Sequence, residues 1–533
     1  MVAESNGVSM LSNHEIPSRK LRVSGSHVRE NGDVLEADFQ YRRNNLTANS
    51  DGTISVHPET HKYTFRTQMK PKKTGLLLVG LGGNNGSTLY GSLIANRNKL
   101  SWRTKNGTQH ANYLGSVTQS TTVHLGWDGH RQVHVAFNEL LPMVDPNDLI
   151  VHGWDIHGFN MYEAMVNAKV FEPELQDQLR SEMEKVKPMP SIYYEDFIAS
   201  NQKARATNII KGGNKQEHLE HIRKDIRDFK QKHNLECVIV LWTASTERYV
   251  DVRDGLNTTA NDMLNSIRNN ESEVSPSNIF AVASILEGAN YINGSPQNTL
   301  VPGIIELAQQ HKVHIGGDDF KSGQTKIKSV LVDFLVNTGL RTESIVSYNH
   351  LGNNDGKNLS EQPQFRSKEI SKSSVVDDMV EANHILYPTA KRPDHVIVIK
   401  YVPFVGDSKR AMDEYTSSIF MGGQQTIVLH NTCEDSLLAA PIILDLTLLT
   451  ELASRIQYST ETSDGYESFH AVLSILSLLL KAPVVPQNTP VCNALMKQLG
   501  CVTKLLCACA GVAVDTDLQL EFFTKLPPAM VKA

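Results

Sequence analysis

The chain has 533 residues, of which 40% are hydrophobic and 21% charged, so it is typical of a folded globular protein rather than a mainly disordered one. At about 150 residues per domain, this length predicts three or four packing units, or one enlarged core with insertions. Lys and Arg number 52 against 58 Asp and Glu, and the net charge of −6 provides no general field for nucleic acid or anionic lipid. We therefore expect neither partner.

Cysteine content and the beginning of the sequence bear on the compartment. Six cysteines are too few for a disulfide scaffold, which favours a reducing cytosol. The first thirty residues contain Glu4, Glu15 and Glu30 and no apolar core of signal-peptide length. Apolar runs such as 505–514 are shorter than the ~18 residues of a membrane span. We expect a cytoplasmic protein without a membrane segment.

The predicted elements begin with a loose tail and a small β region, because the turn signals Asn31-Gly32 and Asp51-Gly52 separate short alternating stretches. The continuous apolar run 75–79 then predicts a strand buried on both faces of a parallel sheet. Similar runs, mostly separated by room for helices, recur at 148–153, 237–243, 279–283, 313–316, 345–348, 395–401 and 426–430. This alternation predicts an α/β fold.

Helices are predicted between and after these strands. Residues 174–187 and 217–232 are charged, with apolar positions every three or four residues, which predicts surface helices that cover the sheet. The strand pattern stops near residue 437, and 437–456 and 469–480 read as apolar helices. We therefore expect the chain to end in helices.

A glycine-rich turn follows the first buried strand. Gly80, Gly82 and Gly86 would let backbone N–H groups at a helix start approach a pyrophosphate. The spacing is GxGxxxG rather than GxGxxG, and no carboxylate follows about 20 residues later. A plausible ribose-binding acid, Asp155, comes after the next strong strand. The loop favours dinucleotide binding, and the alternative is a tight turn without a ligand.

A second candidate site lies after the strand at 237–243. Thr243, Ser245 and Thr246 place small hydroxyl side chains at the carboxyl end of a buried strand, where open α/β sheets bind ligands. The alternative is simple helix capping by Ser245 or Thr246.

Lysine recurs with acids and amides in four later segments, at 316–326, 349–356, 365–372 and 406–409. Lys368 and Lys372 are four residues apart and would share one helix face. Two such ammonium groups suit a phosphate dianion, and a lysine crowded by cations has its pKa lowered toward that of a general base. The alternative for each piece alone is a solvated helix face or an ordinary turn.

The remaining polar clusters predict structure rather than metal binding. Asp435-Ser436 precedes an apolar helix and reads as its N-cap, a role that does not exclude contact with a ligand. The histidines between 124 and 157 and the cysteines between 501 and 509 lack the spacing of a zinc site. We expect no metal.

Five unusual strings, in this order, closely resemble those of eukaryotic myo-inositol-1-phosphate synthases. They are GLGGNNGS at 80–87, NGSPQN at 293–298, SYNHLGNNDG at 347–356, FRSKEISKS at 365–373 and GDSK at 406–409. The resemblance runs from about residue 60 to about residue 515, and only the two ends of the chain depart from it.

The resemblance implies an NAD-dependent isomerase, an intramolecular lyase that converts D-glucose 6-phosphate to 1D-myo-inositol 3-phosphate in the first step of inositol biosynthesis. Oxidation at carbon 5, enolisation, aldol cyclisation and reduction by the same cofactor make up the reaction. It also implies a homotetramer. The implied organisation is a tail and small β region (1–70), a Rossmann domain (71–325), an inserted catalytic and oligomerisation domain (326–437) and a helical part that returns to the Rossmann domain (438–533).

Site residues are carried over from the same family by matching motif. The implied catalytic residues are Lys368, Lys372, Lys409, Lys481, Asp319, Asp435 and Asn353. The implied NAD-binding residues are Gly82, Gly83, Asn84, Asn85, Gly86, Ser87, Asp155, Ser191, Ile192, Gln202, Arg205, Thr243, Ala244, Ser245, Thr246, Ser295, Asp319, Ser322, Asn354, Asp355, Lys368, Gly406, Asp407, Asp435 and Ser436.

Roles for the four lysines follow from the same resemblance. Lys368 and Lys409 would stabilise oxygen and transfer protons at the oxidised carbon, and Lys372 and Lys481 would bind the aldehyde end or the phosphate. Asp319 and Asp435 would hold them. The main alternative function is an NAD(P)-dependent dehydrogenase of a phosphorylated sugar, and a third class is a non-catalytic scaffold that binds NAD.

Overall fold

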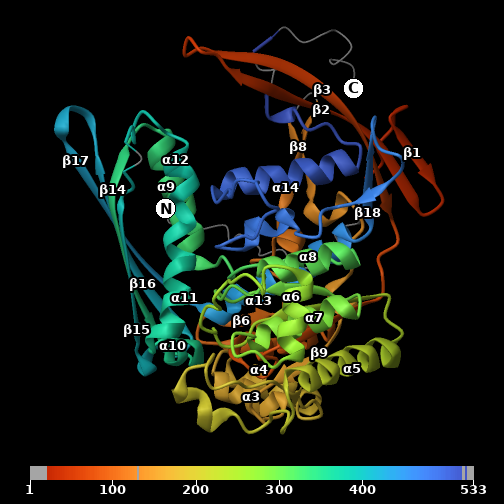
Figure 1. Cartoon of the computed structure of the whole chain (residues 1–533), viewed down its shortest axis with the longest axis vertical. Helices are drawn as coiled ribbons and strands as arrows, with labels where there is room; N and C mark the ends of the chain where they lie inside the picture. Colours follow the sequence, from red (N-terminus) through yellow and green to blue (C-terminus); the bar gives the residue numbers. More distant parts are fainter. Residues whose placement is uncertain (1–20, 129–130, 390, 519–522, 525–533) are drawn as a thin grey trace, which may run out of the picture.

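A six-stranded parallel sheet forms the centre of the computed structural model, which describes residues 21–128, 131–389, 391–518 and 523–524 (Figure 1). Counted along the chain, its strands lie in the order 3-2-1-4-5-6 of a Rossmann fold. From edge to edge they are β10 (Met189–Pro190), β9 (Ile150–Asp155), β4 (Thr74–Val79), β11 (Cys237–Trp242), β12 (Asn290–Asn293) and β13 (Ile315–Gly316). The predicted α/β fold is confirmed.

Both faces of this sheet are buried, as the continuous apolar strands require. Alternate residues of β4 point into two different cores. Leu76 and Leu78 pack in the first core, and Leu77 and Val79 pack in the second. The first core contains α1 (Asn84–Arg97), α3 (Met161–Ala168), α4 (Pro173–Met183) and α13 (Asp435–Ala453). The second contains α5 (Lys215–His233), α6 (Ala260–Arg268), α7 (Pro276–Leu286) and α8 (Pro302–His311).

One predicted strand is wrong. Residues 279–283 lie inside α7, and all five are fully buried. A short apolar run reads alike as a buried strand and as a helix surrounded by core, because periodicity disappears when every face is covered. The strand at this position is β12, which begins four residues after α7 ends.

A second sheet lies beside the first, with the order β15-β14-β16-β17. Its strands are β14 (Arg341–Leu351), β15 (Asp394–Tyr401), β16 (Ser408–Ser418) and β17 (Gln424–Glu434). Helices cover its inner face in Figure 1, namely α9 (Gly323–Asn337), α10 (Asn354–Asn358), α11 (Gln362–Ser373) and α12 (Asp377–Glu381). The face away from these helices carries exposed side chains.

A third, antiparallel sheet joins the two ends of the chain. The hairpin of β2 (Val34–Ala48) and β3 (Ile54–Gln68) is longer than the predicted small β region and extends away from the body (Figure 1). Its other strands are β1 (Val28–Asn31), β18 (Ile456–Thr460) and β19 (Glu467–Ser468). Strands therefore continue beyond residue 437, contrary to the prediction. The predicted loose tail falls mainly on residues 1–20, outside the described part.

Smaller elements complete the chain. Two hairpins and a short helix separate α1 from β9, namely β5 (Ser101–Thr104), β6 (Gly107–His110), α2 (Val117–Ser120), β7 (Thr122–Trp127) and β8 (Gln132–Ala136). The last long helix is α14 (Leu495–Cys509).

The predicted helix at 469–480 is also wrong, and its true conformation matters for the site. This stretch has only a 3₁₀ helix, Ser474–Leu479, between extended segments. Val472 pairs with Ile315 of β13, and Leu480 pairs with Phe320 just beyond it. Backbone hydrogen bonds to a distant strand outweigh the local apolar pattern here, and they bring residue 481 to the end of the Rossmann sheet.

Helix α13 is long and apolar enough to cross a membrane by composition. However, 83% of its apolar window is buried inside the protein, as expected of a core helix. Its N-cap is Glu434 rather than the predicted Asp435-Ser436. The Asp407 side chain instead accepts hydrogen bonds from the Ser436 backbone N–H (2.8 Å) and hydroxyl (2.7 Å).

A buried ion pair ties α13 to the N-terminal sheet. Arg455 and Glu451 are fully buried and 2.7 Å apart. Arg455 also donates to the carbonyl oxygens of Gln68 and Pro142, and Glu451 accepts from the Lys72 backbone N–H. Loss of one member would leave the other charge buried without its partner.

We expect Arg455→Met to lower the free energy of unfolding by about 3–5 kcal/mol, because Glu451 would stay buried without the cation it pairs with. Urea unfolding measures the change. Arg103→Met is the control, since Arg103 pairs with Glu174 at the surface and exposed pairs add little. Equal unfolding midpoints for the two variants would contradict the prediction.

Candidate active site

The glycine turn joins β4 to α1 at the centre of the sheet. Gly80 has φ +97°, which favours glycine, and an added Cβ would lie 2.7 Å from the Ala244 backbone. A Cβ on Gly86 would lie 2.4 Å from the Leu81 carbonyl oxygen. Gly86 therefore permits close packing of α1 on its own loop, the role of the third glycine in dinucleotide-binding turns, although the spacing is one residue longer.

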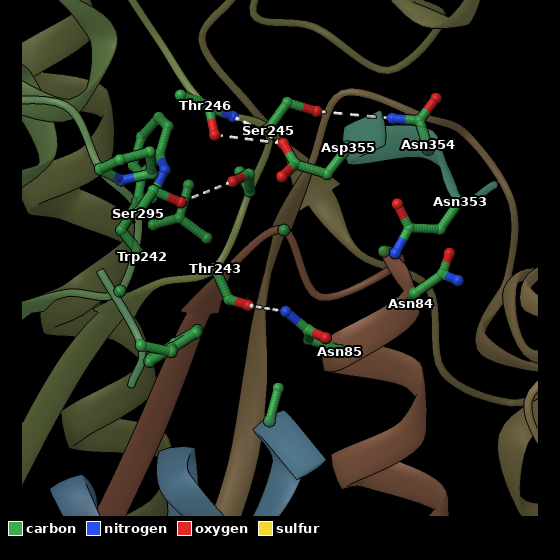
Figure 2. A pocket seen from close by; sticks show the side chains of 18 of the residues that line it. Asn84, Asn85, Trp242, Thr243, Ser245, Thr246, Ser295, Asn353, Asn354 and Asp355 are labelled. Carbon is green, nitrogen blue, oxygen red and sulfur yellow. Dashed lines mark hydrogen bonds between the residues drawn. The ribbon is translucent and has the colours of Figure 1, made fainter. Parts of the chain in front are cut away.

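The opposite wall comes from the segment after β11, which contacts the first two residues of α10, Asn354 and Asp355 (Figure 2). The Asn85 amide donates to the Thr243 hydroxyl at 3.1 Å, and the Asn354 amide to Ser245 at 3.4 Å. Thr246 donates to the buried Asp355 carboxylate from both its backbone and its hydroxyl. No described helix begins between β11 and α6, so the alternative of simple helix capping by Ser245 or Thr246 is wrong.

A third group of predicted residues lies where β9 and β10 end. Asp155 ends β9, and its carboxylate accepts from the His157 backbone N–H at 2.9 Å. Burial raises the pKa of Asp155. Arg205 donates to the Gln202 side-chain oxygen at 3.1 Å and also faces Asp155, which opposes this rise. A carboxylate here suits the hydroxyl groups of a ribose.

The predicted lysines form a cluster around two carboxylates, Asp319 and Asp435. Asp319 Oδ1 accepts from Lys368 Nζ at 2.9 Å and from Lys481 Nζ at 3.2 Å. Lys409 Nζ lies 3.3 Å from Asp435 Oδ1. Lys372 donates to two amide oxygens, on Gln324 (3.2 Å) and Asn349 (3.0 Å).

Crowding gives these groups different charge states. Burial alone would raise the pKa of Asp319, but Lys368 and Lys481 outweigh it and hold the pKa well below its usual range. Burial would lower the pKa of Lys368, but Asp319 and Asp355 raise it above the ordinary value. For Lys481, burial dominates and lowers the pKa to about 7. One lysine of the pair is thus firmly charged, and the other is poised to gain or lose a proton near neutral pH.

Crowding also shifts the pKa values of Lys372 and Asp435. Burial and the charges of Lys409 and Lys481 lower the pKa of Lys372 well below its usual value. Burial would raise the pKa of Asp435, but Lys409 and Lys368 outweigh it and lower the pKa. Within the described ranges, no group of three His, Cys, Asp or Glu side chains could hold a metal ion.

The cavity that joins these regions encloses, with its open mouth, about 1140 Å³ of empty space. It runs from Asp155 to the lysines on Asp319, so one cavity offers polar groups at both of its ends. It is lined by predicted residues, namely Gly83, Asn84, Asn85, Asp155, Ser191, Ile192, Arg205, Thr243, Ala244, Ser245, Thr246, Ser295, Asp319, Ser322, Asn353, Asn354, Asp355, Lys368, Lys409, Asp435 and Lys481.

Eight predicted residues do not line this cavity. They are Gly82, Gly86, Ser87, Gln202, Lys372, Gly406, Asp407 and Ser436. Asp407, for example, accepts from Asn84 at 3.2 Å and caps α13. A Cβ on Gly82 would meet the Asp155 carboxyl group at 3.3 Å.

Sequence reasoning missed two kinds of residue. The apolar lining, including Ile156, Ile198 and Trp242, carries no chemical signal in the sequence. Gln324 and Asn349, which bond Lys372, lie within strings already singled out, but their neighbours in space could not be known.

A family model described as myo-inositol-1-phosphate synthase matches residues 74–506. The chain belongs to this family. Inositol-3-phosphate synthase 1-A of Xenopus laevis is 58% identical over 504 residues, which cover 95% of this chain and 89% of the relative. Inositol-3-phosphate synthase 1 of Homo sapiens is 56% identical over 501 residues, 94% of this chain and 89% of the relative.

A solved structure is similar throughout. The crystal structure of inositol-3-phosphate synthase from Caenorhabditis elegans is 66% identical and superposes with a TM-score of 0.94 over 96% of this chain and 99% of that one. The resemblance seen in the five strings is therefore confirmed at the level of the family. The roles of individual residues stay predictions.

We expect Gly86→Val to weaken NAD binding and lower the melting temperature together, because its side chain would push α1 away from the carbonyl oxygens of Gly80 and Leu81. Calorimetry with NAD and thermal melting measure the two effects. Gly465→Val is the control, since a Cβ there meets no atom within 4 Å. Unchanged NAD affinity in a folded Gly86→Val protein would contradict this role for the turn.

Proposed function

We propose that this chain is an inositol-3-phosphate synthase, an isomerase that converts D-glucose 6-phosphate to 1D-myo-inositol 3-phosphate. The family match and the relatives of that name, at 54–59% identity, support this proposal. The structural observation that carries it is the Asp319 carboxylate shared by Lys368 and Lys481 in the same cavity as a dinucleotide-type glycine turn.

NAD is the cofactor of this family. Bound here, it would supply reversible hydride transfer at carbon 5 of the substrate. The residues around the glycine turn and at the end of β9 suit such a cofactor. The amino end of α1 and the turn at Gly83 would hold the pyrophosphate, since helix N–H groups and the helix dipole favour anions. Asp155 would accept hydrogen bonds from the adenosine ribose, and Thr246 and Asp355 would position the nicotinamide end.

The reaction needs a base for the carbon 6 proton and a cation for the carbon 5 oxygen, and the two lysines on Asp319 suit these roles. Oxidation at carbon 5 makes the carbon 6 proton acidic, and its loss places negative charge on the carbon 5 oxygen. A charged Lys368 would stabilise that oxygen by about 3–4 kcal/mol. Lys481, whose pKa burial lowers to about 7, would take the carbon 6 proton in its neutral form.

Lys372 and Lys409 would bind the substrate phosphate together with the amino end of α9. Helix α9 begins at Gly323, after the N-cap Ser322 that lines the cavity. A phosphate dianion would return charge to Lys372 by offsetting the neighbouring cations. This division differs from the one implied by the resemblance, which paired Lys372 with Lys481.

Lys368→Ala should abolish inositol phosphate formation, with a loss of at least about 10²–10³ in rate, because an oxygen-stabilising cation is removed. Lys481 and Ser371 still donate to Asp319 in this variant, so the protein should remain folded. Product is measured by chromatography after incubation of purified protein with glucose 6-phosphate and NAD, while absorbance follows NADH.

Lys357→Ala is the matched control, an exposed lysine on the nearby α10. The wild-type protein should form inositol phosphate without accumulation of NADH. Steady NADH accumulation would instead identify a dehydrogenase of a phosphorylated sugar, and NAD binding without turnover would identify a scaffold. Full turnover by Lys368→Ala would remove Lys368 from the mechanism.

The organisation of the chain is part of the proposal. Residues 71–325 would form the Rossmann domain, 326–437 the catalytic and oligomerisation domain and 438–533 the part that returns to the first, with 1–70 as tail and small β region. We also propose a cytoplasmic homotetramer. The outer face of the second sheet supports oligomerisation, because apolar side chains gather there with exposed fractions of 40–68%: Tyr348, Val396, Met412 and Val428.

The double variant Met412→Lys, Val428→Lys should reduce the particle mass measured by light scattering, because charges on this face would oppose its burial between copies. Val252→Lys is the control, an exposed apolar residue outside the second sheet. A wild-type monomer, or an unchanged mass in the double variant, would contradict this interface.

A further inference from the structure

The Asp319 carboxylate has an unequal set of partners on its two oxygens. Oδ1 accepts from both Lys368 Nζ (2.9 Å) and Lys481 Nζ (3.2 Å). Oδ2 accepts from the Ser371 hydroxyl at 2.6 Å. Ser371 is fully buried on α11, between Lys368 and Lys372. Its hydroxyl thus occupies the oxygen that a second lysine would otherwise use.

We propose that Ser371 is a positioning residue that fixes the rotation of the Asp319 carboxylate, so that Lys368 and Lys481 must share one oxygen and only one of them is held firmly in its charged form. The inference rests on the proposed function in assigning the other lysine, Lys481, as the base.

The physical argument concerns what Asp319 would do without the hydroxyl. Oδ2 would be left buried without a donor, which is costly for a charged oxygen. Rotation about the Cβ–Cγ bond would turn Oδ2 toward one of the lysines and satisfy it. Lys368 and Lys481 would then each have an oxygen of their own, and both would hold their protons.

Backbone hydrogen bonds limit how else Asp319 could move if the Ser371 hydroxyl were removed. The Asp319 N–H donates to the Ser295 carbonyl (3.1 Å), and the Lys481 N–H donates to the Asp319 carbonyl (2.7 Å). Asp319 also has φ +61°, a conformation that few non-glycine residues adopt. With the main chain fixed on both sides, the side-chain torsion is the remaining freedom.

Other charged groups face Lys481 from every packed element. They are Asp319 itself, Lys368 and Lys372 of α11, Lys409 of β16, and Asp435 of α13. Asp318 precedes Asp319 on the same turn, and burial raises its pKa well above the ordinary value. All these residues remain in a Ser371 variant, so a changed titration reports the rearranged carboxylate.

The test compares kcat against pH for the full-length wild-type protein, Ser371→Ala and Ser371→Thr. A neutral base loses activity as pH falls through its pKa. The acid limb of Ser371→Ala should therefore move to higher pH by about 1 unit, with the alkaline plateau retained. Ser371→Thr keeps the hydroxyl and should restore the wild-type limb.

Ser367→Ala is the matched control. Ser367 is equally buried, one turn earlier on α11, but its hydroxyl donates to the Glu247 backbone carbonyl at 2.8 Å. Its acid limb should coincide with the wild type. An unmoved limb in Ser371→Ala, or an equal shift in Ser367→Ala, would overturn the proposal.

A measurement without turnover separates this inference from the proposed function. In protein labelled with ¹³C at lysine Cε, the Lys481 resonance is identified by its loss in Lys481→Arg, and its titration midpoint should rise in Ser371→Ala. If the wild type forms no inositol phosphate, the proposed function is wrong while the resonance still tests the carboxylate. If product forms but neither the acid limb of kcat nor the titration midpoint of the Lys481 resonance moves in Ser371→Ala, the proposed role of Ser371 is wrong.

Discussion

The site depends on one buried carboxylate that holds two lysines from distant parts of the chain. Asp319 follows β13, Lys368 lies on α11, and Lys481 lies in the stretch after the 3₁₀ helix. Buried charges are stable only when they are paired and hydrogen-bonded, so each of these residues needs the other two. The carboxylate therefore connects the Rossmann sheet, the second sheet and the C-terminal part at one point.

Backbone hydrogen bonds position Asp319 and Lys481 next to each other. Phe320 pairs with Leu480, and the Lys481 N–H bonds to the Asp319 carbonyl, so that the two side chains leave the main chain as neighbours. On the other side, the turn at Gly80 packs against Ala244 and brings the cofactor cradle to the same edge. In the proposed function, NAD and the lysines on Asp319 would act on adjacent carbons of one small substrate, because the scaffold fixes both.

Much of the fold could be predicted from the sequence, and the failures have a common cause. Runs such as 75–79 and 237–243 are strands as expected, since a strand covered on both faces must be apolar throughout. The same rule misled at 279–283, a helix covered on every face, and at 469–480, where pairing with β13 replaced a local helix. Asp435 was expected to cap α13, but Asp407, 28 residues earlier, does so. In each case a distant contact prevailed over local preference.

The sequence by itself determined the family, the α/β class and the residue types of the site, because glycine turns, apolar strands and the strings around Lys368 and Lys409 are local and specific. Only the tertiary structure decided which of the two lysines on Asp319 holds its proton more firmly. Lys368 and Lys481 are chemically identical side chains, and their pKa values part because burial and the sharing of one Asp319 oxygen act on them unequally. Charge state in a crowded interior is a property of distances between residues, which no linear spacing encodes.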